Sequence, residues 1–204
     1  MENFIEIENF GFNSLTITAL MTMLFTIFQG YGVMIQNKMI WQKKSVESLS
    51  ATLFFLYCFY FIAFFIYGLE KRSVAMSFNG LLAIPYIPIV IGFLKFKKLN
   101  FKEKISLPLT MAVVPLMIII PSKDIFLLIL LMISLVILGT QPLEMIKTKK
   151  RGAVEIKFIL IFSITSIFWL IYAIAISNWV LIIFNSSALI IYAIIISLYY
   201  RYKI

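Results

Sequence analysis

Histidine is absent from the 204 residues, and cysteine occurs once, at Cys58. The lack of histidine removes the most common metal ligand in proteins and the side chain that titrates near neutral pH. A single cysteine allows no intramolecular disulfide. The chain also lacks an acidic pair inside an apolar run, a glycine-rich loop that could hold a phosphate, and paired cysteines. These absences exclude most catalytic arrangements, and we expect neither an enzyme nor a bound cofactor or metal.

Charge is scarce as well, because 13% of the residues are charged whereas 62% are hydrophobic. So few charges could not cover the surface of a soluble protein of this size. Apolar runs of about 17 to 22 residues recur along the chain, and each is long enough to cross a hydrocarbon core of about 30 Å. The runs are apolar on every side, which favours helices over the alternating strands of a membrane barrel. We therefore predict an all-α integral membrane protein whose surroundings are the lipid bilayer.

Seven apolar runs are predicted to cross the membrane, at residues 12–36, 49–69, 73–94, 105–121, 125–143, 158–177 and 179–200. The fourth is short and contains Pro108 and Pro115, so a re-entrant or distorted segment is the alternative to a full crossing there. Residues 10–98 and 123–204 then form two three-helix units, and residues 99–122 form a linker helix between them. This is a 3+1+3 arrangement.

An internal duplication follows from the order and spacing of residues in the two units. An offset of 105 residues aligns Gln36 with Gln141, Lys44 with Lys149, Phe64 with Trp169, and Tyr67 with Tyr172. With one added residue at the outer turn, an offset of 106 aligns Phe78 and Asn79 with Phe184 and Asn185, Tyr86 with Tyr192, and Lys97 with Lys203. A single span between the units makes both enter the membrane in the same direction. Parallel repeats of this kind are typical of transporters whose site lies between the repeats.

The 18 lysines and arginines give a net charge of +9 and lie in short connections between the apolar runs. That distribution sets membrane orientation and is unlike a nucleic-acid footprint, so we expect no nucleic-acid partner. Alternate connections carry 15 and 3 of these basic residues. By the positive-inside rule the N-terminus lies outside and the C-terminus is cytoplasmic. We expect the plasma membrane (the cell's inner membrane) as the location, with the first span retained because the acidic start lacks the basic region of a signal peptide.

Polar side chains inside the predicted spans are the candidates for function. Every charged residue lies in a connection or within a turn of one, and Glu144 is the nearest to an exception, so a proton-carrying group within the membrane is missing. Asn79 and Asn185 each lie about six residues into a span, and Trp169 lies at a similar depth. An amide beside an aromatic face suits a molecule with hydroxyls on its edge. A lone membrane asparagine more often joins two helices, but a pair at equivalent positions of a duplicated unit favours a solute site.

Trp169 stands three residues before Tyr172 and sixteen before Asn185, and Phe64, Tyr67 and Asn79 follow the same order in the first repeat. This pattern, with the 3+1+3 order of spans, resembles the PQ-loop superfamily and, within it, the SWEET (MtN3/saliva) sugar transporters and their half-sized SemiSWEET relatives. The resemblance implies a central pocket lined by Phe64, Asn79, Trp169 and Asn185, in which amides bind a sugar between aromatic faces. Phe64 in place of a smaller residue narrows such a pocket and puts disaccharides in doubt.

The proline-glutamine motif that names the superfamily is incomplete. The glutamines are present as Gln36 and Gln141, but Ile35 and Thr140 stand where the resemblance places prolines, and Pro142 is displaced by two residues. Proline lets a helix bend because it removes a backbone hydrogen bond. We expect a cytoplasmic gate where the Gln36 and Gln141 ends of the first and fifth spans meet, near Pro142.

Other residues are expected to supply the flexibility and the outer gate. Gly30 and Gly32 in the first span and Gly139 in the fifth, together with the displaced proline, are the candidates for bending. Tyr67 and Tyr172 lie near the outer ends of the second and sixth spans. They are either outer-gate residues or members of an aromatic belt at the membrane interface.

The function expected from these features is uncoupled, facilitated transport of a small neutral solute, a mono- or small saccharide, by alternating access. A vitamin or amino acid carried by the same fold is the first alternative, since a fold does not determine its cargo. The second alternative is a receptor or scaffold of seven helices that transports nothing, in which Asn79 and Asn185 matter only for stability. Two repeats in one chain make a complete pathway in a monomer, and a homo-oligomer stays open.

Overall fold

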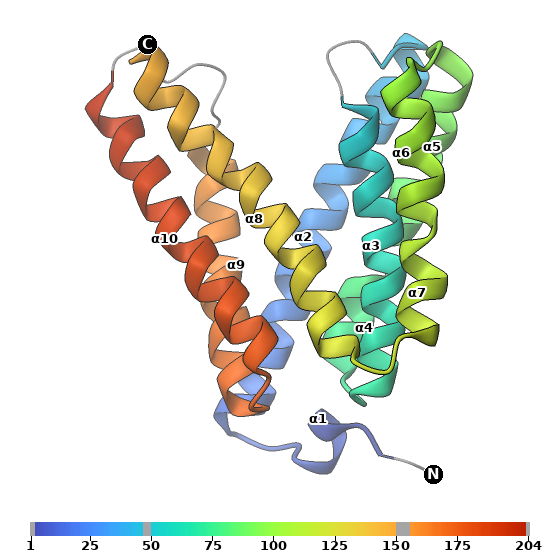
Figure 1. The fold of residues 1–204 in the computed structure, drawn as a ribbon. Coiled ribbons are helices and arrows are strands. Elements are labelled where there is room, and N and C mark those ends of the chain that lie inside the picture. The colour runs from blue at the N-terminus through green and yellow to red at the C-terminus, as the bar shows by residue number, and fades with distance from the viewer. Residues whose placement is uncertain (1–2, 47–49, 150–155, 203–204) are drawn as a thin grey trace. The chain divides into compact units, whose positions relative to one another are not determined.

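The computed structural model describes residues 3–46, 50–149 and 156–202, and these ranges contain helices and no strand. In chain order the helices are α1 (Ile5–Glu8), α2 (Ser14–Lys43), α3 (Ala51–Glu70), α4 (Val74–Gly80), α5 (Ala83–Phe96), α6 (Phe101–Met111), α7 (Val113–Ile119), α8 (Lys123–Thr148), α9 (Ile156–Ala175) and α10 (Trp179–Arg201) (Figure 1). The chain forms two compact units. Unit 1 comprises Met1–Phe10 and Met23–Lys123, and unit 2 comprises Gly11–Thr22 and Asp124–Ile204.

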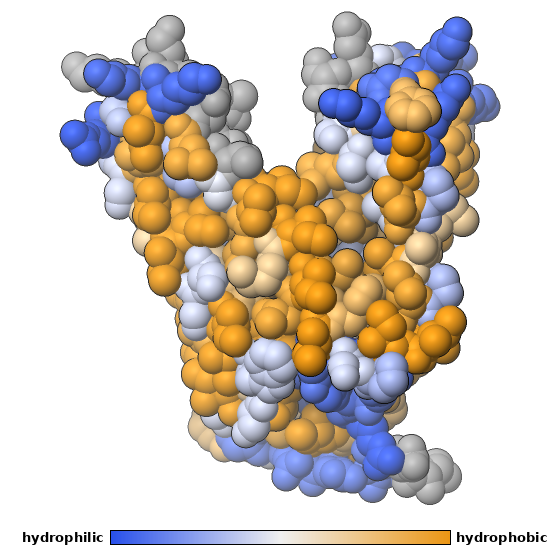
Figure 2. All heavy atoms as spheres, in the orientation of Figure 1, coloured by the Kyte–Doolittle hydropathy of each residue, from blue (hydrophilic) through white to orange (hydrophobic). Residues whose placement is uncertain are grey.

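The prediction of an all-α membrane protein is confirmed. Among the described residues, four helical segments are long and apolar enough to cross a membrane: α2, α3, α4 together with α5, and α10. A shorter apolar helix covers Ile159–Ala175 within α9. Hydrophobic side chains cover the middle of the visible helices and hydrophilic ones gather at their ends (Figure 2). This distribution matches a surface that faces lipid in the middle and water at both ends.

Two helices extend further than the apolar runs predicted. The first run was expected to end at residue 36 and the fifth at residue 143, but α2 continues to Lys43 and α8 to Thr148. An apolar run marks where the hydrocarbon ends, whereas a helix satisfies its own backbone hydrogen bonds and can continue into the aqueous layer. Each of these helices is followed by a residue in the left-handed region, Lys44 (φ 48°) and Lys149 (φ 55°).

Several helix boundaries repeat along the chain with the offset of 105 residues. Helices α3 and α9 are both 20 residues long and begin at Ala51 and Ile156. Each is followed by a left-handed residue at the same distance, Arg72 (φ 49°) and Ser177 (φ 54°). The duplication seen in side-chain order is therefore also present in the backbone.

Prolines account for two breaks in the helices. The sequence indicated a distorted fourth span as an alternative, whereas the break in the third span was not predicted. The third predicted span divides at Leu81 and Leu82 into α4 and α5, and the fourth divides at Ala112 into α6 and α7. Pro85 follows the first break and Pro115 follows the second. A proline cannot donate a hydrogen bond to the carbonyl four residues earlier, and its ring collides with that carbonyl. The second repeat has no proline at the corresponding place, so α10 is continuous.

Each unit has its own hydrophobic core. In unit 1, α2, α3 and α5 bury Ile40, Phe55 and Phe93 against one another. Helices α6 and α7 lie along α3, so the linker segment packs on this unit (Figure 1). In unit 2, Tyr192 and Ile195 of α10 belong to one cluster with residues of α8 and α9.

The acidic N-terminal segment packs on the start of α4. The buried carboxylate of Glu6, on α1, accepts hydrogen bonds from the Ser73 hydroxyl (2.9 Å), the Val74 amide (2.9 Å) and the Ala75 amide (3.1 Å). The first amides of a helix have no partner within the helix, and a negative charge there also meets the positive end of the helix dipole. Glu6 therefore holds the start of the helix that carries Asn79.

Candidate functional site

Asn79 lies on α4 in unit 1. Ser73 caps this helix by accepting a hydrogen bond from the Met76 amide (3.0 Å). The Asn79 side chain is 6% exposed, and its Nδ2 donates to the Thr26 hydroxyl of α2 at 2.8 Å. An asparagine amide has two N–H hydrogens and an acceptor oxygen. This bond uses one hydrogen, and no described residue donates a hydrogen bond to the Asn79 Oδ1.

Two glycines let α3 and α4 touch along their backbones and so place Asn79 close to α3. A Cβ on Gly80 would lie 2.5 Å from the Cα of Phe65, and a Cβ on Gly68 would lie 2.5 Å from the backbone nitrogen of Ser77. Real side chains do not tolerate such distances, so only glycine permits this approach. Small residues commonly serve in this way where membrane helices pack closely.

The Phe64 ring of α3 lies in a column of aromatic side chains. It stacks on Tyr60, with centroids 5.8 Å apart, and on Tyr67, with centroids 6.2 Å apart. Phe64 and Tyr67 are both buried. The ammonium of Lys71 lies 5.4 Å from the centre of the Tyr67 ring, at the end of the column. The predicted site residue Phe64 and the predicted gate residue Tyr67 are thus in direct contact.

In unit 2, α9 brings Trp169 together with Tyr172. Their spacing of three residues puts both rings on one side of the helix. The rings meet edge to face, with centroids 5.7 Å apart and planes at 88°. Trp169 is 7% exposed and Tyr172 is fully buried. The pair stands at the positions that Phe64 and Tyr67 occupy in the first repeat.

Asn185 lies on α10, which begins with Asn178 as its cap: the Asn178 Oδ1 accepts from the Leu181 amide at 3.1 Å. Asn185 is 3% exposed, and its Nδ2 donates to the backbone carbonyl of Leu181 at 2.8 Å. As with Asn79, no described residue donates a hydrogen bond to its Oδ1. Both asparagines therefore have one N–H hydrogen engaged, and no described residue donates to their acceptor oxygens.

The difference between the two asparagines follows from the helix that opens each repeat. The residue of α8 that corresponds to Thr26 at the offset of 105 is Leu131, which has no acceptor. The Nδ2 of Asn185 is bonded to its own helix instead. Sequence reasoning missed Thr26, although a signal was present: Thr18, Thr22 and Thr26 recur every four residues in an apolar helix, and all three are buried. That spacing places them on one face of α2.

The predicted site residues divide between the units, with Phe64 and Asn79 in unit 1 and Trp169 and Asn185 in unit 2, and we call these two pairs the candidate half-sites. Asn79 is the sixth residue of α4 and Asn185 the seventh of α10. The two helices begin 105 residues apart while the asparagines are 106 apart, so their depths differ by one residue, or about 1.5 Å of helix rise.

The predicted gate residues occupy matching places. Gln36 and Gln141 each lie seven residues before the end of their helix, so both are within helices rather than at their ends. Pro142 is buried, and α8 continues through it without a break. The side chain of Gln141 lies outside the described residues. Tyr67 and Tyr172 each precede the end of their helix by three residues.

Amides, one hydroxyl and aromatic rings are the chemical groups that the two half-sites offer. Among the residues that the structure describes, no group of three or more histidine, cysteine, aspartate or glutamate side chains could hold a metal ion. Cys58 is buried in the core of unit 1 with Phe55 and Ile89. Groups of this kind recognise a neutral molecule by hydrogen bonding and stacking.

Residues 126–204 match the model of a protein family described as a sugar efflux transporter for intercellular exchange. The matched region contains α9, α10 and nearly all of α8, and therefore Trp169 and Asn185. The resemblance to SWEET-type transporters predicted from the sequence is confirmed over these residues. No curated protein matches the chain.

Proposed function

We propose that the protein, an integral membrane protein whose residues 126–204 match a family of sugar transporters, carries a small sugar down its concentration gradient. The observation that carries the proposal is the pair of buried asparagines. Each has its Nδ2 engaged by the protein and its Oδ1 without a donor among the described residues. An acceptor held in a fixed orientation suits a solute that offers hydroxyl groups.

In this proposal Asn79 and Asn185 accept hydrogen bonds from sugar hydroxyls, while Trp169 and Phe64 pack against the C–H faces of the ring. The bulk of Phe64 favours a monosaccharide over a larger saccharide. Seven spans in a 3+1+3 order surround the solute path. The N-terminus is outside and the C-terminus cytoplasmic.

Two gates open alternately in the proposed cycle. Gln36, Gln141 and Pro142 close the path at the cytoplasmic side, and Tyr67 and Tyr172 close it at the outer side. The complete burial of both tyrosine rings supports a gate role over an aromatic belt, because belt residues meet the membrane interface. The spans predicted from the sequence hold no ionisable group deep in the membrane, which supports transport without proton coupling.

The test is uptake by proteoliposomes of a labelled panel of hexoses, pentoses, a disaccharide and non-sugar solutes, without an imposed proton gradient. We expect one class of monosaccharide to equilibrate across the membrane. Asn79→Ala, Asn185→Ala and Trp169→Ala should each reduce uptake about five- to thirtyfold, because each removes a group that contacts the solute in this proposal. A lost hydrogen bond or aromatic contact is worth about 1–2 kcal/mol.

Ser197→Ala is the matched control, because Ser197 is an exposed polar residue of the same helix as Asn185. Among the described residues its hydroxyl bonds only to the Ala193 carbonyl. It should transport at the wild-type rate. Uptake of a vitamin or amino acid in place of sugars would show that the proposed sugar cargo is wrong. No uptake of any solute by folded wild-type protein, with the asparagine variants changing only thermal stability, would establish the receptor or scaffold alternative.

A further inference from the structure

One end of unit 1 carries a dense set of lysines with few acidic groups among its described residues. Seven exposed lysines lie on the last turns of α2 and α5, at the residues that follow these helices, and on the first turns of α6: Lys38, Lys43, Lys44, Lys95, Lys98, Lys102 and Lys104. We call this set the basic end. Among the described residues of these segments, Glu103 is the one carboxylate, and it pairs with Lys97 at 2.6 Å. The seven other lysines have no carboxylate partner in the described chain.

Contacts between α2 and α5 bring these lysines to one place. The indole Nε1 of Trp41 donates to the Pro88 carbonyl at 3.1 Å. A Cβ on Gly92 would lie 2.8 Å from Ile40, which shows how closely the two helices approach. The ammonium of Lys95 lies over the Trp41 ring, 5.3 Å from its centre. The lysines of α2 and α5 therefore share one end of the unit.

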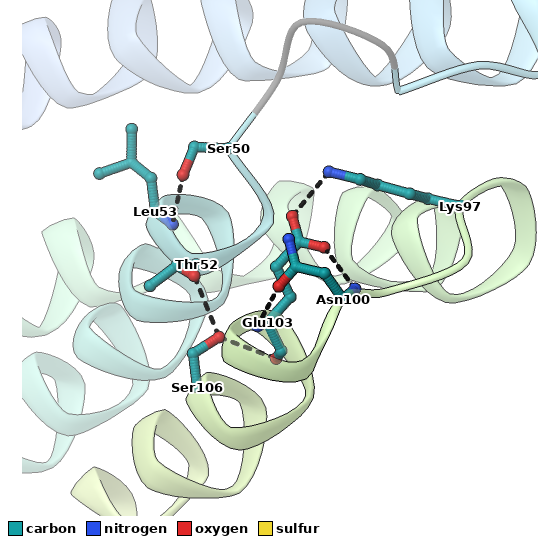
Figure 3. A network of polar contacts seen from close by, with 7 residues as sticks. All are labelled: Ser50, Thr52, Leu53, Lys97, Asn100, Glu103 and Ser106. Atoms are coloured by element: carbon teal, nitrogen blue, oxygen red, sulfur yellow. Dashed lines mark hydrogen bonds and ion pairs between the residues drawn. The ribbon is translucent and has the colours of Figure 1, made fainter.

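The turn between α5 and α6 is held by a polar network (Figure 3). Asn100 and Glu103 form a capping box in which each side chain accepts from the other's backbone amide at 3.0 Å. The hydrogen bond from Lys97 lowers the pKa of the Glu103 carboxyl below its ordinary value. Ser106 of α6 accepts a hydrogen bond from Thr52 of α3 at 3.1 Å. The network fixes the turn, and its one carboxylate is engaged inside it.

Exposed apolar side chains border the basic end. Phe101 is 78% exposed and stands directly before Lys102. Leu94 and Ile105 are exposed on α5 and α6. Figure 2 shows hydrophilic side chains at the end of these helices directly above the apolar surface that continues along them. A cationic rim over an apolar wall matches the two parts of a phospholipid, an anionic headgroup and its acyl chains.

We propose that the basic end of unit 1 binds anionic phospholipid, with Lys98 and Lys102 on the headgroup phosphate and Phe101 against the acyl chains. A phospholipid satisfies the uncompensated charge and covers the exposed apolar residues at once, which a soluble anion cannot do. The site is independent of the transport proposal, because none of its residues belongs to either half-site.

Trp41 provides a local reporter, since it lies at the basic end and is 38% exposed. In protein carrying Trp169→Phe and Trp179→Phe, Trp41 is the one tryptophan left. We expect phosphatidylglycerol with brominated acyl chains to quench its fluorescence in detergent micelles at a lower lipid fraction than brominated phosphatidylcholine. Each lysine near an anionic surface contributes about fivefold, so Lys98→Gln with Lys102→Gln should raise the phosphatidylglycerol fraction needed for half quenching about twenty-fivefold.

Two further variants separate a site from general surface charge. Lys147→Gln with Lys149→Gln makes the same change of charge in unit 2 and should leave quenching at Trp41 unchanged. Lys98→Arg with Lys102→Arg keeps the charge and should bind like wild type. Equal quenching by the two lipids, or equal weakening by the two glutamine pairs, would overturn the proposal. Displacement of phosphatidylglycerol by an equal concentration of inorganic phosphate would overturn the choice of lipid as the ligand. The comparison of lipids in the Trp41 protein decides the question even where a glutamine pair fails to fold.

Discussion

At the scale of single residues, the buried asparagine amides of the two repeats have different hydrogen-bond acceptors. Asn79 donates to Thr26 on another helix, whereas Asn185 donates to Leu181 on its own. A buried amide without a partner costs roughly 1–3 kcal/mol, so each needs an acceptor. The bond to Thr26 connects α4 to α2 and orients the Asn79 side chain. The bond that Asn185 donates lies within α10 and therefore connects α10 to no second helix.

We predict that Thr26→Val raises the KM for sugar about tenfold, because the Asn79 amide loses the acceptor that orients it. Thr26→Ser keeps the hydroxyl and should restore the wild-type value. Thr18→Val is the control, since the Thr18 hydroxyl bonds to the Ser14 carbonyl of its own helix. Uptake kinetics in proteoliposomes measure this. Wild-type KM in Thr26→Val would show that Thr26 does not orient Asn79.

The capping box of α6 predicts a dependence of stability on pH. The pKa of Glu103 is lowered in the folded protein, chiefly by the hydrogen bond from Lys97. Its stabilisation is therefore complete above the unfolded pKa, near 4.3, and is lost as the pH falls through the lower folded value. Glu103→Gln should lower the free energy of unfolding by about 1 kcal/mol at pH 7. The difference in this free energy between the variant and the wild type should shrink below about pH 4.

Thermal unfolding in detergent at a series of pH values measures this difference. Glu70→Gln is the matched control, because Glu70 also pairs with a lysine, Lys123, but is 41% exposed at its side chain. An exposed ion pair contributes little, so this variant should unfold near the wild-type temperature. An undiminished difference between Glu103→Gln and wild type in acid would contradict the assignment.

At the scale of helices, glycine and proline determine where helices touch and where they break, which the apolar pattern does not show. Gly68 and Gly80 allow α3 and α4 to touch, and Pro85 separates α4 from α5. The apolar run at residues 73–94 is continuous in hydropathy, but its backbone is not a continuous helix. As a result Asn79 sits near the end of a short helix while Asn185 sits within a long one.

We predict that Gly80→Ala destabilises the protein by about 1–3 kcal/mol, because its Cβ would collide with the Phe65 backbone and force α3 and α4 apart. Gly32→Ala is the control, since nothing lies within 4 Å of a Cβ there. It should be neutral or stabilising by up to about 1 kcal/mol. Thermal unfolding compares the two. If Gly32 supplies flexibility for gating, Gly32→Ala should also slow transport while leaving stability intact.

At the scale of the whole molecule, the duplication sets the plan of the chain. The ends of α2 and α8, both ends of α3 and α9, and the left-handed residues that follow these helices recur at one offset, although few side chains are identical. The match to a sugar transporter family lies in the second repeat. The first repeat shares several of these helix boundaries, and it differs from the second repeat at Thr26, at Phe64 and at the break before Pro85, all of which lie at or near its candidate half-site.

The orientation predicted from the basic residues can be measured with single cysteines. Cys58→Ala removes the one native cysteine. In that background Phe10→Cys should react with a membrane-impermeant maleimide added to intact cells, and Lys98→Cys should react only after the membrane is permeabilised. Labelling of Lys98→Cys in intact cells, with Phe10→Cys protected, would reverse the orientation and place both gates on the opposite sides.

The amino-acid sequence by itself determined the class of the protein, the approximate places of its helices and the pairing of its two repeats. These properties depend on composition and on spacing along the chain, because any segment of apolar residues long enough to cross a bilayer must satisfy its backbone internally as a helix. The candidate residues Asn79, Asn185 and Trp169 followed from the same spacing, and Phe64 followed from the family resemblance.

Only the tertiary structure decided which partners those residues have. Thr26 and Asn79 are 53 residues apart, and nothing in their local sequence shows that α2 passes beside α4. The contact depends on glycines that let α3 and α4 approach and on the N-terminal Glu6 that holds the start of α4. Hydrogen-bond partners across helices are set by packing, which is a property of the whole fold and not of any one segment of the chain.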